Sequence, residues 1–293
     1  MGIDNSAVTF VLGSKAAGVD YDRTVTLGRQ NFFPTKRHFQ RSIAELAPAA
    51  QLEQVLAAGG GYAEPFFELI GATEVASIDA SSYEGASLVH DLNDPIPEAW
   101  KGRFTAVIDG GSLEHVFDFT RALRNATELL AVGGHFLSIA PANNFMGHGF
   151  YQFSPELYFR VFVPANGFRL RVMLIQSCDP PSQWFRVLDP ESVRGRVELQ
   201  NGLPTLIYVL AQKVDEKPFL SVRPQQSDYS AAWQAGHDDV DTRGKPQTIG
   251  QRFPPFLKRP LQRLLPLLTN APFNVKSGCY RPMAEGDLLA GRF

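Results

Sequence analysis

Cysteine is almost absent from this chain of 293 residues, which contains only Cys178 and Cys279. Two cysteines cannot form a disulfide framework or a zinc site by themselves, so we interpret both as buried thiols in a reducing cytoplasm. Long apolar runs are also missing, because none approaches the ~18–20 residues needed to cross a bilayer. The first residues lack the charged and apolar regions of a secretory signal. We therefore expect a cytoplasmic protein without a transmembrane segment.

An excess of charge of either sign is missing as well. Lysine and arginine together number 28 against 30 aspartates and glutamates, which gives a formal net charge of −2. Such a balance provides no bulk attraction for nucleic acid, so we expect no nucleic-acid partner. The sequence has no internal repeats and no long low-complexity tract. Its length suits one large domain with an appendage, or two small domains.

What the sequence does contain is a strand–helix–strand pattern in residues 104–144. The pattern consists of an apolar run at 104–108, an amphipathic helix at 119–130, a Gly133-Gly134 turn and a second apolar run at 135–140. Parallel strands joined in this way bury both faces, and ligands of such sheets bind outside the carboxyl ends of the strands. We therefore expect the chemistry at residues 109–115 and 141–144, which follow the two strands.

Further strands and helices are predicted on both sides of this unit. The strands lie at 8–12, 24–27, 74–78, 87–89, 169–176 and 205–211, and the helices lie between 34 and 71 and after Ser154. The last two strands indicate a sheet with one antiparallel strand. We assign residues 1–214 to one domain, with a helical insertion at about 34–71. Residues 215–293 are predicted to form a loosely packed arm, whose basic amphipathic segment 252–269 could contact a membrane surface or a protein.

Acidic residues follow three successive predicted strands, at Asp79, Asp91 and Asp109. Aspartate caps helices and starts turns wherever strands end, so a single such residue carries no meaning. Three carboxylates on one rim favour a ligand with several hydrogen-bond donors.

The central unit resembles a known family. Leu113-Glu114-His115-Val116, then Gly133-Gly134 and Pro141, are similar to the region from strand four to strand five of class I S-adenosylmethionine-dependent methyltransferases. The helix after Ser154, which ends at Gly167-Phe168, resembles the helix before strand six of that family. The resemblance covers roughly residues 24–212. It implies an α/β fold with a doubly wound, mostly parallel sheet of seven strands, one of them antiparallel, and S-adenosylmethionine as cofactor.

The resemblance also implies roles for individual residues. The cofactor is expected to contact Gly28, Arg29, Asp79, Ala80, Ser81, Asp91, Leu92, Asp109 and Gly110. Asp79 suits the two ribose hydroxyls, Asp91 suits the adenine amine, and Asp109 is expected near the sulfonium and amino-acid end. Candidates for removing a proton from the acceptor are His115, His148 and Tyr151, although His115 could instead cap the next helix and Tyr151 could simply pack. Asn143, Asn144 and Gln152 are candidates for binding a polar acceptor, and no metal site is expected.

The first loop departs from the family pattern. The family's first strand usually ends in a glycine-rich loop, whereas the segment TVTLGRQ has the single glycine Gly28 followed by Arg29. The alternative is Gly59-Gly60-Gly61, but the leucines and valine before it repeat at helical spacing. We therefore favour residues 24–28 as the first strand and its loop.

Two functions from different classes follow. The first is methyl transfer from S-adenosylmethionine to an oxygen or nitrogen of a small polar molecule or sugar. The alternative is a non-catalytic, methyltransferase-like binding or scaffold protein, which the degenerate first loop suggests. A nicotinamide-dependent oxidoreductase ranks last, because the chain lacks a G-x-G-x-x-G fingerprint.

Overall fold

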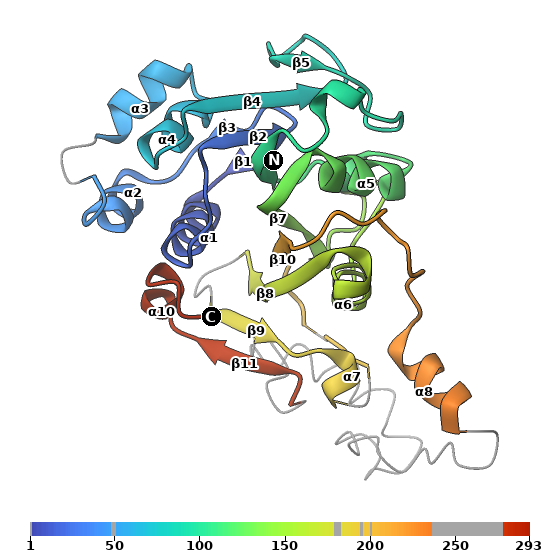
Figure 1. The fold of residues 1–293 in the computed structure, drawn as a ribbon. Helices are drawn as coiled ribbons and strands as arrows, with labels where there is room; N and C mark the ends of the chain where they lie inside the picture. The colour runs from blue at the N-terminus through green and yellow to red at the C-terminus, as the bar shows by residue number, and fades with distance from the viewer. Residues whose placement is uncertain (1, 48–50, 179–182, 194–195, 200, 236–277) are drawn as a thin grey trace.

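A single mixed sheet forms the centre of the molecule (Figure 1). The computed structural model describes all residues except 1, 48–50, 179–182, 194–195, 200 and 236–277. Within them the sheet has nine strands in the order β11-β9-β8-β10-β7-β6-β2-β4-β5. One half is parallel and contains β2 (Arg23–Leu27), β4 (Glu74–Asp79), β5 (Leu88–Val89), β6 (Phe104–Asp109) and β7 (Leu130–Asn143). The other half contains β8 (Phe168–Ser177), β9 (Trp184–Val187), β10 (Thr205–Lys213) and β11 (Tyr280–Met283).

The strand order confirms the doubly wound fold. Taken in chain order, β5-β4-β2-β6-β7 is the arrangement 3-2-1-4-5, in which the order reverses between β2 and β6. β10 runs antiparallel to both β7 and β8, as the last pair of predicted strands indicates. The sheet is larger than predicted, because β9 and β11 extend it as further antiparallel strands. β9 lies in a connection that is otherwise polar, and its partner β11 is distant in the chain. No local sequence pattern therefore predicts that these two strands pair.

Helices cover both faces of the sheet (Figure 1). On one face lie α1 (Asn5–Ala16), α2 (Lys36–Ile43), α3 (Leu52–Gly59), α4 (Glu64–Leu69) and α10 (Glu285–Leu289). On the other face lie α5 (Phe119–Leu129) and α6 (Pro155–Val161). Shorter elements are β1 (Gly2–Ile3), β3 (Asn31–Phe32), η1 (Glu98–Trp100), η2 (Leu113–His115), η3 (Pro164–Asn166), α7 (Pro190–Val193) and α8 (Ser227–Ala235). No helix in the described ranges is both long and apolar enough to cross a bilayer.

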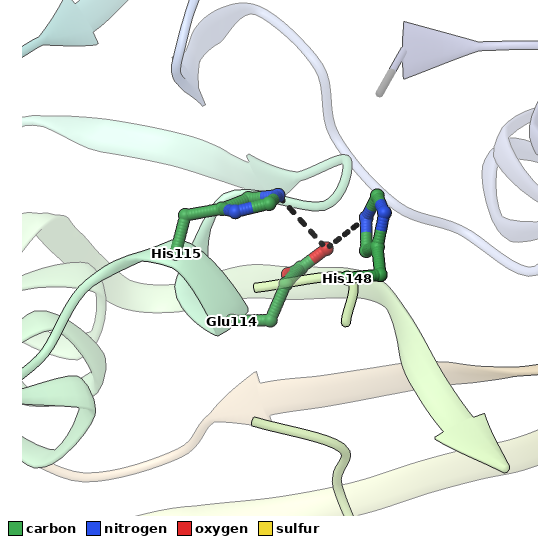
Figure 2. Close-up of side chains that lie close together, drawn as sticks. All are labelled: Glu114, His115 and His148. Carbon is green, nitrogen blue, oxygen red and sulfur yellow. Dashed lines mark ion pairs between the residues drawn. The ribbon is translucent and has the colours of Figure 1, made fainter. Parts of the chain in front are cut away.

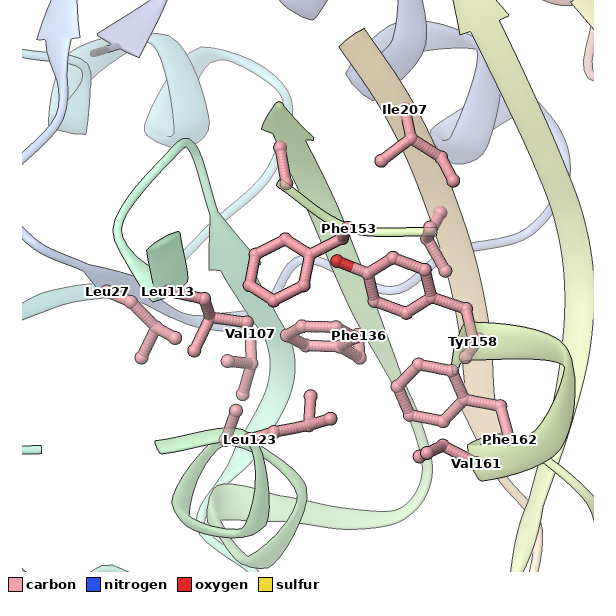
Figure 3. Close-up of a cluster of buried hydrophobic side chains, with 14 of the residues drawn as sticks. Leu27, Val107, Leu113, Leu123, Phe136, Phe153, Tyr158, Val161, Phe162 and Ile207 are labelled. Carbon is pink, nitrogen blue, oxygen red and sulfur yellow. The ribbon is translucent and has the colours of Figure 1, made fainter. Parts of the chain in front are cut away.

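The two faces have separate hydrophobic cores, as the period-two alternation of buried strands requires. Val107 of β6 lies in one core cluster with Phe136 of β7, Tyr158 of α6 and Phe162, which follows α6 (Figure 3). Its neighbours in β6, Ala106 and Ile108, belong to the core under α1 to α4. Packed side chains therefore cover both faces of the central parallel strands, and a ligand can reach them only at the strand ends.

The predicted strand at residues 8–12 is wrong, because these residues lie in α1. The Asp4 side chain caps this helix by accepting a hydrogen bond from the Ala7 backbone N–H at 2.8 Å. Residues 7–14 are all buried, so the helix has almost no polar face and lacks the helical periodicity that would identify it. A short apolar run of this kind cannot be distinguished from a buried strand by its pattern.

The end of the chain packs more tightly than a loose arm. β11 pairs with β9, and α10 lies against α1 so closely that a Cβ on Gly13 would be 2.2 Å from the Leu288 carbonyl oxygen. Phe219 is buried and its ring contacts Phe168. Residues near 219 and after 278 therefore belong to the main fold, whereas the segment 252–269 lies outside the described residues.

The first strand of the nine-stranded sheet in chain order is β2, which contains the residues favoured above as the first strand. The competing glycines at 59–61 follow α3, and Gly60 ends that helix in the left-handed conformation with φ 57°. They serve as a helix C-cap, which is the ordinary use of glycine at this position.

Candidate functional site

The loops after β2, β4, β6 and β7 meet at one edge of the sheet, because the carboxyl ends of parallel strands point the same way. The order reverses between β2 and β6, and such a switch point is where doubly wound sheets bind ligands. We call this edge the rim.

Glu114 stands at the centre of a cluster on the rim. Its side chain is fully buried, yet its Oε1 lies 3.8 Å from His115 Nε2 and 3.7 Å from His148 Nε2 (Figure 2). These distances are too long for hydrogen bonds. Among the described residues neither Glu114 oxygen has a hydrogen-bond partner. The two imidazoles are partly exposed and cross edge to face, with ring centroids 5.0 Å apart.

The electrostatics of the cluster follow from burial. Burial and the nearby Asp109 carboxylate raise the pKa of Glu114 to about 8. Burial and the neighbouring His148 lower the pKa of His115. At neutral pH the protein alone therefore holds a mostly protonated Glu114 beside a mostly neutral His115, so this contact is not an ordinary salt bridge.

The loop after β7 brings His148 to Glu114 by backbone contacts. The Phe150 and Tyr151 N–H groups donate to the Glu114 carbonyl oxygen at 2.7 and 3.3 Å. Gly149 has φ 73°, and a Cβ there would lie 2.7 Å from the same oxygen. The Tyr151 hydroxyl donates to the Phe117 carbonyl at 2.6 Å, so Tyr151 braces this loop. The structure thus places His115, His148 and Tyr151 close together on the rim, and their part in catalysis stays a prediction.

Asp109 ends β6 and is held by hydrogen bonds within the protein, and its expected contact with the cofactor stays a prediction. Its side chain is fully buried, and Oδ1 accepts hydrogen bonds from the Ser112 and Leu113 N–H groups at 2.8 and 3.2 Å. Oδ2 accepts from the Ser138 hydroxyl at 2.6 Å. Burial raises the pKa of Asp109 above its ordinary value despite these bonds. The residue shapes the turn that leads to Glu114, and a local Asp-Gly-Gly signal cannot distinguish this role from ligand binding.

The first loop is filled by the protein's own side chains. Gly28 has φ 68°, and a Cβ there would lie 2.8 Å from Ser112 Oγ. Ser112 Oγ and Gln30 Nε2 both donate to the Leu27 carbonyl, at 2.5 and 2.6 Å. A Cβ on Gly110 would lie 2.3 Å from Gln30 Oε1, which is buried and has no partner among the described residues. Sequence reasoning missed Gln30, although it follows Gly28 and Arg29 directly.

Arg29 points away from the switch point. Its Nε donates to Glu64 Oε1 at 2.6 Å, and its guanidinium lies 4.0 Å from the centre of the Tyr62 ring. A further N–H donates to the Glu84 carbonyl at 2.8 Å. Arg29 therefore ties α4 to the loop after β4, and it is held in place without a ligand.

The acidic residues of the rim differ in what surrounds them. Asp79 is partly exposed at the end of β4, and its carboxylate accepts from the Ser81 N–H at 3.3 Å, with Ala80 exposed between them. Asp91 is exposed, and hydrogen bonds from the backbone and side chain of Asn93 lower its pKa. Leu92 is buried in the core beneath α5, so only its backbone is near the rim.

The predicted acceptor-binding amides are occupied within the protein. Asn143 Nδ2 and Asn144 Nδ2 donate to Asn201 Oδ1 at 2.8 and 2.9 Å, and Asn144 also donates to the Leu203 carbonyl. Gln152 Oε1 accepts from the Phe145 N–H at 2.8 Å. The two asparagines join the end of β7 to the loop before β10, and Gln152 braces the loop after β7. Their role in acceptor binding stays a prediction.

Comparisons with known proteins address the fold. No protein-family model matches the sequence, and no curated protein matches it. A solved branched-chain polyamine synthase from Thermus thermophilus is 14% identical with a TM-score of 0.36, and the match covers 73% of this chain but only 58% of that one. A SAM-dependent methyltransferase from Aquifex aeolicus is 10% identical with a TM-score of 0.36, with 69% of this chain and 90% of that one covered.

A third similar structure is the Burkholderia thailandensis 1,6-didemethyltoxoflavin-N1-methyltransferase, solved with 1,6-didemethyltoxoflavin and S-adenosylhomocysteine. It is 14% identical with a TM-score of 0.37, and the match covers 71% of this chain and 79% of that one. Similarity at this level adds nothing to what the sheet itself establishes. From its strand order and the antiparallel β10, the chain has the class I methyltransferase-like α/β fold.

Proposed function

We propose that this protein transfers a methyl group from S-adenosylmethionine to an oxygen or nitrogen atom of a small polar molecule or sugar. The observation that carries the proposal is the position of Glu114, His115 and His148 beside the switch point of the sheet. The partly exposed carboxylate of Asp79 lies at the end of a neighbouring strand on the same rim.

The rim residues fit the cofactor's chemistry. The Asp79 carboxylate can accept hydrogen bonds from both ribose hydroxyls, and Asp91 can accept from the adenine amine. Gln30 Oε1 is a buried acceptor without a donor among the described residues, next to Gly28 and Gly110. Buried acceptors normally have a donor, and the cofactor's amino group would supply one. The cofactor itself supplies an activated methyl carbon.

The acceptor must be aligned and, if it carries a proton, deprotonated. His115 and His148 are each partly exposed on the rim, which places their rings within reach of an acceptor bound there. Tyr151 holds the loop that carries His148. The preference for a small polar acceptor rests on the two partly exposed imidazoles, because the amides of Asn143, Asn144 and Gln152 already have partners in the protein.

Calorimetric titration with S-adenosylmethionine tests the proposal. We expect binding by the wild-type protein, and at least about tenfold weaker binding by Asp79→Ala, which loses charge-assisted hydrogen bonds worth ~1.5–3 kcal/mol. The matched control is Asp20→Ala, since Asp20 is an exposed aspartate before β2, at the opposite end of that strand. If folded wild-type protein does not bind S-adenosylmethionine, the proposed methyltransferase function is refuted.

A non-catalytic binding protein is the second candidate. The observation that favours it is that Ser112 and Gln30 already occupy the space at Gly28 and Gly110. This alternative predicts that no S-adenosylhomocysteine forms when the protein is incubated with cofactor and the small-molecule fraction of a cell extract. Product formation that depends on Asp79 would exclude it.

A further inference from the structure

Within the described residues, the buried carboxyl group of Glu114 has no hydrogen-bond partner and no lysine or arginine beside it. The only ion-pair contacts of Glu114 within the described residues are to the imidazoles of His115 and His148, and no lysine or arginine there pairs with it. Both of its oxygens lack hydrogen-bond partners in this part of the chain, and so does His148 Nε2. A buried carboxyl group avoids the cost of its charge by staying protonated, as Glu114 does in the protein alone, or by pairing with a cation or a metal ion.

Three potential ligand atoms converge at this point. Glu114 and His115 come from η2 and His148 from the loop after β7, and one ligand atom from each of the three residues lies within 4.8 Å of the other two. In Figure 2 the Glu114 carboxylate points between the two rings. Ligands at about 2.0–2.2 Å from a zinc-like ion lie roughly 3–3.5 Å apart. The two Glu114–histidine separations, 3.7 and 3.8 Å, need to close by only a few tenths of an ångström, and rotation of the partly exposed rings would bring the two histidine nitrogens to the same spacing.

We propose that Glu114, His115 and His148 bind a divalent transition-metal ion. Imidazole nitrogens with one carboxylate suit Zn²⁺, Fe²⁺, Co²⁺ or Mn²⁺, whereas Mg²⁺ and Ca²⁺ prefer oxygen ligands alone. Three protein ligands leave coordination positions open, and both rings are partly exposed, so solvent or a small ligand can reach the ion. The sequence pattern did not predict a metal, because His148 is brought to Glu114 only by the fold.

The metal site does not depend on methyl transfer. The imidazoles are ligands when the ion is bound, and their Nε2 atoms can accept a proton from an acceptor only in the metal-free protein. The ion binds whether or not S-adenosylmethionine does. The two proposals can therefore fail separately. A protein that binds cofactor but no metal refutes this inference alone, and a protein that binds metal but no cofactor refutes the proposed function alone.

The experiment uses the full chain after treatment with EDTA. Calorimetry with ZnCl₂ and with MnCl₂ measures stoichiometry and affinity, and CoCl₂ gives the visible absorption of a site with nitrogen and oxygen ligands. We expect one ion per chain, no comparable binding of MgCl₂, and at least about tenfold weaker binding in Glu114→Gln and in His148→Ala.

A matched control is His90→Ala. His90 is another partly exposed histidine. Its ring meets that of Trp100 edge to face with centroids 5.6 Å apart, and it is not one of the three clustered residues. Circular dichroism checks that each variant is folded, and His148→Ala carries the test if Glu114→Gln does not fold, because His148 lies on a partly exposed loop. Absence of binding, equal affinity for Mg²⁺, or zinc affinity that is unchanged in both cluster variants would overturn the proposal.

Discussion

Two glycines of one loop provide a matched test of how the site is assembled. Gly147 and Gly149 flank His148, and both have left-handed backbone angles, with φ 84° and 73°. A Cβ on Gly147 would meet nothing within 4 Å, whereas a Cβ on Gly149 would lie 2.7 Å from the Glu114 carbonyl oxygen and 3.1 Å from Glu114 Cγ. Gly147→Ala and Gly149→Ala therefore share the backbone penalty and differ only in the contact with Glu114.

The magnitudes follow from these two terms. Placing alanine in the left-handed backbone conformation costs roughly 1–2 kcal/mol in either variant. Only Gly149→Ala adds a steric conflict, which costs about 1–3 kcal/mol in packed surroundings. Moving the loop to relieve the conflict breaks the 2.7 Å hydrogen bond from the Phe150 N–H to the Glu114 carbonyl. The loop can detach locally, so the difference should be larger in loop protection than in global stability.

Hydrogen exchange of the Phe150 amide is the appropriate assay. We expect its protection to fall at least about tenfold more in Gly149→Ala than in Gly147→Ala, because 1.4 kcal/mol of local stability corresponds to a factor of ten. Affinity for Zn²⁺ should fall in the same order, since His148 moves with the loop. Equal protection in the two variants would refute the reasoning that the backbone contact with Glu114 positions His148.

Three further predictions concern the surrounding fold. Burial, then the charge of Arg171, lowers the pKa of His135 from 6.5 to about 4, so stability is present above pH 6.5 and is lost as the pH falls toward 4. By linkage the free energy of unfolding of the wild type falls by about 2 kcal/mol at pH 5. Urea unfolding of His135→Leu should not show this fall, and parallel pH profiles of stability for the two proteins would contradict the prediction. Asn125→Leu removes hydrogen bonds from Nδ2 to the Leu92 and Asp94 carbonyls at 3.0 and 2.7 Å. It should lower the free energy of unfolding by about 1–3 kcal/mol and weaken cofactor binding, and an unchanged urea midpoint would argue against it. Lys213→Met keeps the buried stem but loses donation from Nζ to the Leu130 carbonyl at 2.9 Å, so we expect a loss of roughly 1–3 kcal/mol in chemical denaturation, with Lys15→Met on an exposed helix end as the control.

The sequence by itself determined the parallel half of the fold. The predicted strands at 24–27, 74–78 and 104–108 lie within β2, β4 and β6, and the predicted Ser154 cap accepts from the Glu156 N–H at the start of α6. These elements are specified by short-range chemistry: continuous apolar runs, helical spacing and capping residues. The same local order places the loops after the parallel strands on one rim, so the location of the site was also predictable.

Only the tertiary structure decided how individual side chains are used. Asp79 and Asp109 both end apolar strands, yet Asp79 is partly exposed and Asp109 is turned inward onto Ser138. Glu114 is buried against His148 because the Phe150 N–H bonds to its carbonyl, and this contact joins residues that are far apart in the chain. Burial and ligand geometry arise from such long-range contacts, and no local pattern of residues contains them.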